Sequence, residues 1–181
     1  MSKAIDDLKH EHEAILSALK ILNSITENLK TQKTVSSPDI ISFIGFLKEF
    51  ADKCHHGKEE GILFPELIKA GMPEKGGPIE VMLAEHAQGR KYIKEMENAI
   101  AETPDYSGFI ESAEGYSILL SNHIYKENTI LFPAAENILS KDKLEEIYEA
   151  FEQHEEKVIG QGRHEELHET LKELKKRYVQ E

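Results

Sequence analysis

The sequence lacks the features that mark secreted, disulfide-bonded or membrane-spanning proteins. Cys54 is the only cysteine, so no disulfide framework exists. No run of apolar residues is long enough to cross a bilayer. The N-terminal residues, Met-Ser-Lys-Ala-Ile-Asp-Asp, have neither the basic nor the apolar region of a signal peptide. Together these absences predict a cytoplasmic protein.

Positive charge is also scarce. The chain carries 22 Lys and Arg against 34 Asp and Glu, a formal net charge of −12. It has no basic cluster that could follow a phosphate backbone, so we expect no nucleic-acid partner. The same acidity disfavours an anionic membrane surface, and we expect no membrane partner. A negative field attracts cations, although surface acidity commonly serves only solubility.

What the sequence does have is helical periodicity, in a length of 181 residues that suits one domain with a real core. Apolar residues recur every three to four positions, and Pro or Gly interrupts the pattern between segments. Pro38 is a helix start, and Ser107 and Ser140 are candidate caps. The predicted helices cover residues 3–30, 38–70, 79–102 and 108–139, then a fifth after Ser140 and a last piece from 163 onward.

Four long helices with short connections predict an all-α fold, an antiparallel up-and-down four-helix bundle. We assign the bundle to residues 1–139. Residues 140–181 are predicted to form a C-terminal helical extension packed on the bundle.

One imperfect repeat lies inside the predicted second and fourth helices. Residues 55–65 read His-His-Gly-Lys-Glu-Glu-Gly-Ile-Leu-Phe-Pro, and residues 123–133 read His-Ile-Tyr-Lys-Glu-Asn-Thr-Ile-Leu-Phe-Pro. A shift of 68 positions places His55 on His123 and Glu59 on Glu127. Because residues four apart share a helix face, each pair can grip one metal or let its carboxylate bridge to a second.

The other histidines support a site in the core. On the first helix His12 continues the apolar stripe, whereas His10 falls on the polar face; His86 continues the stripe of the third helix. Each of the four helices therefore places a histidine on or near its core face. Buried carboxylates such as Glu127 are too costly to keep without a partner, so this pattern predicts a bound metal.

The second helix offers two pairs at the same spacing, His55 with Glu59 and His56 with Glu60. The repeat and the position of the apolar stripe favour His55 and Glu59. His56 points about 100° away and could reach a metal from the side. We expect Glu60 to be solvated or hydrogen-bonded outside the metal.

At these residues the sequence resembles the hemerythrin-like, or HHE cation-binding, family over about residues 5–139. The matching motifs are Glu11-His12, Cys54-His55-His56-Gly-Lys-Glu59-Glu60, Glu85-His86 and His123-x-x-x-Glu127. The resemblance implies a four-helix bundle with two non-haem irons, bridged by carboxylates and an oxo or hydroxo group. It implies O2, peroxide or NO as the small ligand. The implied metal ligands are His12, His55, His56, Glu59, His86, His123 and Glu127.

The third helix departs from the oxygen-carrying hemerythrins, which have two core histidines one turn apart. Here His86 has Met82 and Arg90 at those positions. His56 is a candidate replacement, and we expect it beside His55 or His12. A centre with fewer nitrogen donors favours reaction with peroxide or O2 over simple carriage.

Three functions follow from this pattern. The first is a di-iron protein that binds O2 or senses iron or oxidant. The second is a redox enzyme, a di-iron peroxidase or an NO-handling protein. The third is a helical adaptor without metal. The residues do not distinguish the first two, and they do not identify a redox partner.

Two further motifs have a simpler interpretation. His164-Glu165-Glu166-Leu167-His168 fits the zinc protease signature His-Glu-x-x-His, but no third ligand accompanies it. We expect this face to pack on the bundle, with coverage of the metal pocket as a related alternative. Cys54 is expected to be a buried small hydrophobic residue, with a redox-sensitive thiol as the alternative.

Overall fold

The computed structural model describes residues 2–101 and 103–179. Over these ranges all regular secondary structure is helical, with no strand, and three stretches named η are π-helical. The elements are α1 (Lys3–Lys30), α2 (Ser37–Phe46), η1 (Leu47–His56), η2 (Glu59–Leu63), α3 (Phe64–Lys69), α4 (Pro78–Ala99), α5 (Tyr106–Lys126), η3 (Glu127–Leu131), α6 (Phe132–Ile138), α7 (Lys141–Val158) and α8 (Arg163–Tyr178).

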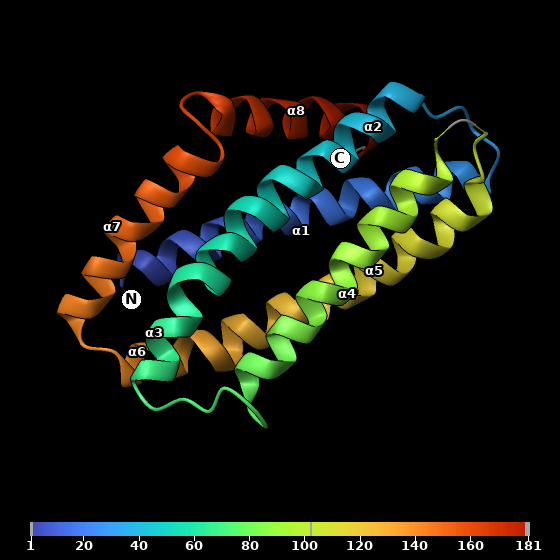
Figure 1. The fold of residues 1–181 in the computed structure, drawn as a ribbon. Coiled ribbons are helices and arrows are strands. Elements are labelled where there is room, and N and C mark those ends of the chain that lie inside the picture. The colour runs from blue at the N-terminus through green and yellow to red at the C-terminus, as the bar shows by residue number, and fades with distance from the viewer. Residues whose placement is uncertain (1, 102, 180–181) are drawn as a thin grey trace.

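The elements form an antiparallel four-helix bundle, which confirms the predicted fold (Figure 1). α1 is the first arm, and α2 through α3 form a second, nearly continuous arm. α4 is the third arm, and α5 through α6 form the fourth. Each arm runs opposite to its predecessor. In the part of the chain that the structure describes, no helix is both long and apolar enough to cross a membrane.

Capping side chains fix where several helices begin. Ser140 accepts a hydrogen bond from the Lys143 backbone at the start of α7, as predicted. The prediction for Ser107 was wrong. Asp105 caps α5 instead by accepting from the Gly108 backbone, because the helix begins earlier than the apolar pattern indicates.

The π-helical stretches η2 and η3 each end on the leucine of a copy of Leu-Phe-Pro. Pro65 and Pro133 have no N–H to donate, and each ring crowds the carbonyl four residues earlier. Widening the preceding turn to i→i+5 hydrogen bonds accommodates both effects. The repeated proline therefore gives a physical reason for irregular helix at Glu59 and Glu127.

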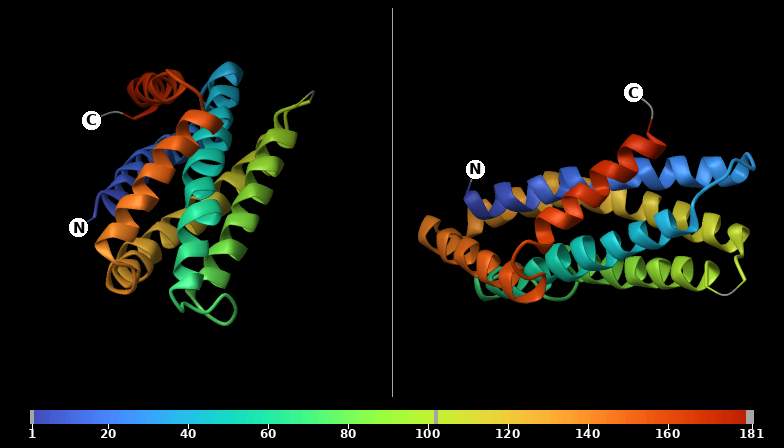
Figure 2. Two further views of the ribbon diagram at one scale, coloured as in Figure 1. Left: turned by 60° about the vertical axis from the view of Figure 1, so that its left-hand side comes forward. Right: turned by 90° about the horizontal axis from the view of Figure 1, so that it is seen from above.

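The C-terminal helices α7 and α8 cover one side of the bundle. α7 contacts α1, η1 and η2, and α8 lies obliquely across α1 and α2 (Figure 2). Leucines of α8 join the apolar cluster around α1 and α2, and Phe151 of α7 joins a second cluster around α3 and α6. The division into a bundle and an extension at residue 139 stays a prediction.

The two apolar clusters lie on either side of a polar layer. One contains Ile15 and the residues beyond it on α1, and the other contains Leu8 and the residues before it. His12 lies between them on the same face. The core is thus interrupted at one level along the bundle, and every arm contributes polar side chains there.

Candidate metal centre

Five histidines and two glutamates meet in this polar layer. None of them exposes more than 3% of its surface. They are His12, His55, His56, Glu59, His86, His123 and Glu127. The structure therefore brings together every residue that the sequence analysis placed at the metal. His10 lies on the exposed face of α1, as the helical phase predicts.

The seven side chains form two overlapping groups that share Glu59. The first half-site consists of His12, His55, Glu59 and Glu127. The second half-site consists of His56, Glu59, His86 and His123. Within each group, one candidate ligand atom per residue lies within 4.8 Å of all the others.

Both carboxylates stand between histidines of different half-sites. One oxygen of Glu127 lies 3.2 Å from His12 Nε2 and 3.2 Å from His123 Nε2. One oxygen of Glu59 lies 3.8 Å from His55 Nε2 and 3.4 Å from His86 Nε2. This placement suits carboxylates that bridge two cations.

The residues fit a pair of cations because their inward-facing atoms have no other partner. Among the described residues, hydrogen bonds are absent at both carboxylate oxygens of Glu59 and of Glu127, at His12 Nε2 and at His55 Nε2. His86 Nε2 and His123 Nε2 face each other at 3.0 Å. Buried donors and acceptors are normally satisfied, so such a concentration of atoms without hydrogen bonds fits a site for positive charge.

The outward-facing nitrogens of four of these histidines, by contrast, each contact an oxygen of a neighbouring side chain. His55 Nδ1 lies 2.8 Å from Glu11 and His123 Nδ1 lies 2.9 Å from Glu85. His12 Nδ1 lies 2.9 Å from the Asn128 amide oxygen, and His86 Nδ1 lies 2.7 Å from Glu60. If each Nδ1–H donates to its oxygen, each Nε2 lone pair faces the centre.

These contacts repeat with the sequence. Glu11 and Glu85 each precede a histidine, yet each binds the histidine of another arm. Phe64 stacks on His86 and Phe132 stacks on His12, with ring centroids 5.9 Å and 5.4 Å apart. The centre is therefore built twice, once by α1 with the second arm and once by α4 with the fourth.

His56 breaks this symmetry, because Ile124 stands at the equivalent position of the repeat. Its ring stacks on His86 at 3.9 Å between centroids, and both of its nitrogens lack a hydrogen bond. We expected it beside His55 or His12, and that prediction was wrong. The π-helical η1 explains the difference, since a widened turn rotates successive side chains by less than a regular α-helix does.

Burial and charge set the proton affinities of the site. Burial alone would lower the pKa of His86, but Glu59 and Glu60 outweigh it and raise the pKa to about 9. Burial and the neighbouring histidines keep the pKa of His56 well below its usual value. Burial opposes the charge of Glu127, but contacts with His12 and His123 hold its pKa well below the ordinary range. A bound cation would displace the histidine protons.

A third group, Glu11, Cys54 and Glu155, also brings candidate ligand atoms together. Lys58 already fills that position, with Nζ 2.8 Å from Glu11 and 3.0 Å from Glu155. Burial and the charge of Glu11 raise the pKa of the Cys54 thiol far above its usual value. The cysteine is therefore a buried, unreactive side chain.

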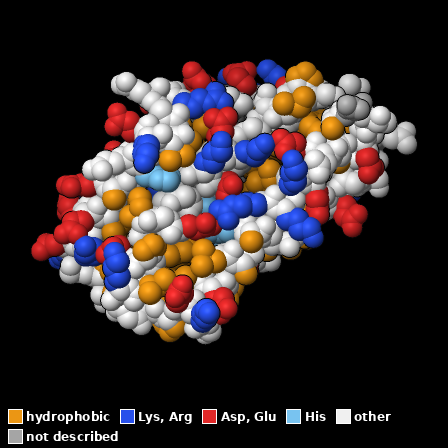
Figure 3. All heavy atoms as spheres, viewed as in Figure 1, with side chains coloured by type: hydrophobic (Ala, Val, Ile, Leu, Met, Phe, Trp, Pro, Cys, Tyr) orange, Lys and Arg blue, Asp and Glu red, His pale blue; other side chains and the backbone are white. Residues whose placement is uncertain are grey.

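The His-Glu-x-x-His segment packs as expected. Leu167, Leu171 and Leu174 are buried, and the rings of His164 and His168 lie against Phe50 at 5.6 Å and 5.3 Å between centroids. Neither histidine belongs to a candidate metal group among the described residues. Figure 3 shows acidic and basic side chains interspersed on one face, with histidine visible only in small areas.

The family model for the hemerythrin HHE cation-binding domain matches residues 3–135. The chain belongs to this family. The match reaches into all four arms of the bundle and includes the whole seven-residue centre. As a member of the family, the protein has a cation-binding domain whose buried histidines and glutamates are the candidate metal ligands.

Two kinds of curated relative are similar to this HHE protein. An uncharacterized protein of Mycobacterium tuberculosis is 23% identical over 167 residues, covering 88% of this chain and 64% of the relative. The iron-sulfur cluster repair protein YtfE of Escherichia coli is 33% identical over 135 residues, covering 68% of this chain and 56% of YtfE. Both matches span less than two thirds of the relative's length. No solved structure matches the chain.

Sequence reasoning missed the residues that hold the ligands from behind. It used Glu11 and Glu85 only as positions of the family motif and assigned no role to Asn128 or Lys58. One signal was present: a glutamate precedes the core-facing histidine of both the first and the third arm. Nothing in the sequence shows that each glutamate reaches across to another arm, because that depends on packing.

Proposed function

We propose that this protein holds two non-haem irons, one in each half-site, and binds O2 or a related small oxidant there. The observation that carries the proposal is the cluster of buried, unpaired nitrogen and oxygen atoms that two carboxylates span. Imidazole and carboxylate together suit iron, and the family match adds cation binding. When bound, the iron pair supplies the redox chemistry, and the protein supplies binding and orientation.

The two half-sites differ in a way that bears on ligand binding. The first half-site offers two imidazoles, from His12 and His55, and the second offers three. With both carboxylates shared, the first half-site has more open positions for an added ligand. We therefore place O2, peroxide or NO at the first half-site.

The surrounding side chains support this use. Phe64 and Phe132 line the centre with apolar rings and limit water at the histidines. Glu11 and Asn128 hold His55 and His12 in one ring orientation, so both nitrogens stay aimed at the same point. Fixed nitrogen donors and an apolar lining favour a small, uncharged ligand over a large or charged one.

A second candidate function is a redox enzyme, either a peroxidase or an NO-handling protein. The similarity to an iron-sulfur cluster repair protein favours a role in repair chemistry within this class. Met82 and Arg90 stand one turn either side of His86, where oxygen carriers have a second histidine, and Arg90 ion-pairs with Asp52 and Glu60.

Absorption spectra of iron-loaded protein test the proposal. We expect a histidine–carboxylate di-iron spectrum that changes when NO or peroxide is added. His12→Ala should abolish the change, whereas the exposed His10→Ala should leave it intact. Catalytic consumption of peroxide would select the enzyme, and stoichiometric binding would select the carrier or sensor. A spectrum unaffected by NO, peroxide and O2 contradicts the proposal.

A further inference from the structure

The centre contains a duplicated lysine–glutamate–histidine arrangement. In the Lys58 triad, Lys58 Nζ lies 2.8 Å from one oxygen of Glu11, whose other oxygen lies 2.8 Å from His55 Nδ1. In the Lys126 triad, Lys126 pairs with Glu85, which lies 2.9 Å from His123 Nδ1. The lysines occupy the same position of the sequence repeat, one behind each half-site.

The two triads differ in their surroundings. The Lys58 side chain is completely buried and has two further carboxylates, from Asp7 at 2.9 Å and Glu155 at 3.0 Å. The Lys126 side chain is 32% exposed, and Glu85 is its only ion-pair partner among the described residues. Water can screen Lys126, whereas Lys58 depends on fixed protein charges.

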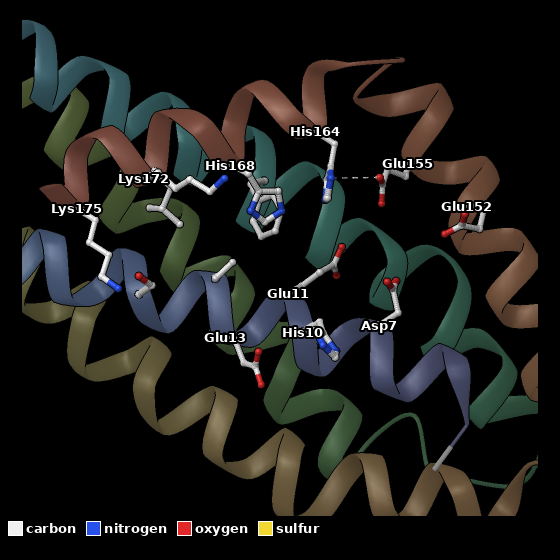
Figure 4. Close-up of a pocket in the computed structure, with 14 residues that line it drawn as sticks. Asp7, His10, Glu11, Glu13, Glu152, Glu155, His164, His168, Lys172 and Lys175 are labelled. Carbon is white, nitrogen blue, oxygen red and sulfur yellow. Dashed lines mark ion pairs between the residues drawn. The ribbon is translucent and has the colours of Figure 1, made fainter.

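Glu155 reaches this position from α7, outside the four arms of the bundle. Figure 4 shows it with Glu11 and Asp7 around the space between α1, α7 and α8. Its second oxygen lies 3.7 Å from His164 Nδ1 on α8. A continuous line of contacts therefore runs from both C-terminal helices to a ligand of the first half-site.

Charge explains what Glu155 contributes. Glu11 shares its negative charge between the Lys58 ammonium and the His55 ring. With Glu155 present, the Lys58 ammonium divides its N–H donors among three carboxylates. It therefore withdraws less negative charge from Glu11. Without it, the ammonium would polarise Glu11 more strongly, and His55 would become a weaker donor to a cation.

We propose that Glu155 is a positioning residue that sets, through Lys58 and Glu11, how strongly the first half-site holds its iron. The proposal rests on the proposed function, because it concerns the half-site with the open ligand positions. It also gives the C-terminal helices a role: they seal one triad and leave the other open to solvent.

The test compares Glu155→Gln with Glu145→Gln in the iron-loaded protein. Glu145 also joins α7 to α1, through an exposed 3.1 Å ion pair with Lys3, but it touches neither triad. In chelator competition, Glu155→Gln should release one of two irons about tenfold more readily, the lower end of the range for residues behind a metal ligand. The reduction potential of that iron should rise. Glu145→Gln should match the wild type in both measurements.

Two more variants keep the test decisive. Lys126→Gln should speed the release of the other iron, and by a much smaller factor than Glu155→Gln, because water already screens the Lys126 triad. Glu155→Gln should have no additional effect in a Lys58→Met background, since it acts through Lys58. Near-UV circular dichroism checks that each variant folds.

The outcomes separate this inference from the proposed function. A wild-type chain without iron overturns the proposed function. A wild type with two irons, together with equal release from Glu155→Gln and Glu145→Gln, overturns only the inference: equal loss would mean that α7 acts by docking alone, and no loss would mean that the triad does not reach the iron.

Discussion

At the scale of single residues, the centre depends on which face of its helix each histidine occupies. His12 is buried and His10 is exposed, as their positions around α1 require. The positions of Glu59 and Glu127 followed from the repeat. What phase did not predict is the partner of His56, because a regular α-helix was assumed where the structure has a π-helix.

The first prediction compares the two histidines of α1. His12→Ala should lower iron content, because it removes one of only two imidazoles of the first half-site. His10→Ala should leave the content unchanged, since its ring bonds only the Asp6 backbone carbonyl. Elemental analysis of both purified variants checks this. Equal losses would mean that the ligand assignment on α1 is wrong.

The second prediction concerns His56 and its neighbour Glu60. His56→Ala should selectively weaken the binding of iron to the second half-site, because it removes one donor there and leaves the bridging Glu59 and Glu127 in place. Glu60→Gln should weaken iron binding much less. Glu60 contacts the outward nitrogen of His86, and the amide oxygen of the glutamine variant can still accept a hydrogen bond from that nitrogen. Iron titration followed by absorption should separate the two sites. A larger effect from Glu60→Gln would reverse the assignment.

At the scale of elements, the sequence predicted the four arms and the C-terminal helices because each has a clear apolar period. It did not predict η1, η2 or η3. Propensity and periodicity carry no direct signal for i→i+5 hydrogen bonding, although Pro65 and Pro133 mark where two of these stretches end. It also missed the reach of Glu155 from α7 to Lys58, a contact that only packing reveals.

The third prediction belongs to α8. A His164→Ala, His168→Ala double variant should keep both irons, because neither ring belongs to a candidate metal group. The wild type should cleave no peptide, since the pair lacks a third ligand. Metal analysis and a peptidase assay test both statements. Complete loss of iron would move this helix into the centre.

At the scale of the whole molecule, a cation should stabilise the fold. The polar layer buries two carboxylates with unpaired oxygens between two apolar clusters, an arrangement that is costly until positive charge arrives. At free iron about 100 times the dissociation constant, each site should add about 2.7 kcal/mol to the free energy of unfolding.

Thermal unfolding with and without iron measures this fourth prediction. The wild type should unfold at a higher temperature when loaded. A Glu59→Ala, Glu127→Ala variant should show a much smaller rise, because both bridging groups are gone. An unchanged wild-type melting temperature would mean that the layer is stable without a cation.

The most direct test of the central claim is the iron content of the 181-residue chain expressed with ample iron. Two half-sites that share Glu59, with Glu127 between His12 and His123, predict about two irons per chain, with nitrogen and oxygen ligands visible in the absorption spectrum. Elemental analysis and the oxidised-state spectrum of one preparation provide both observations. A chain that remains free of iron under these conditions would contradict the account.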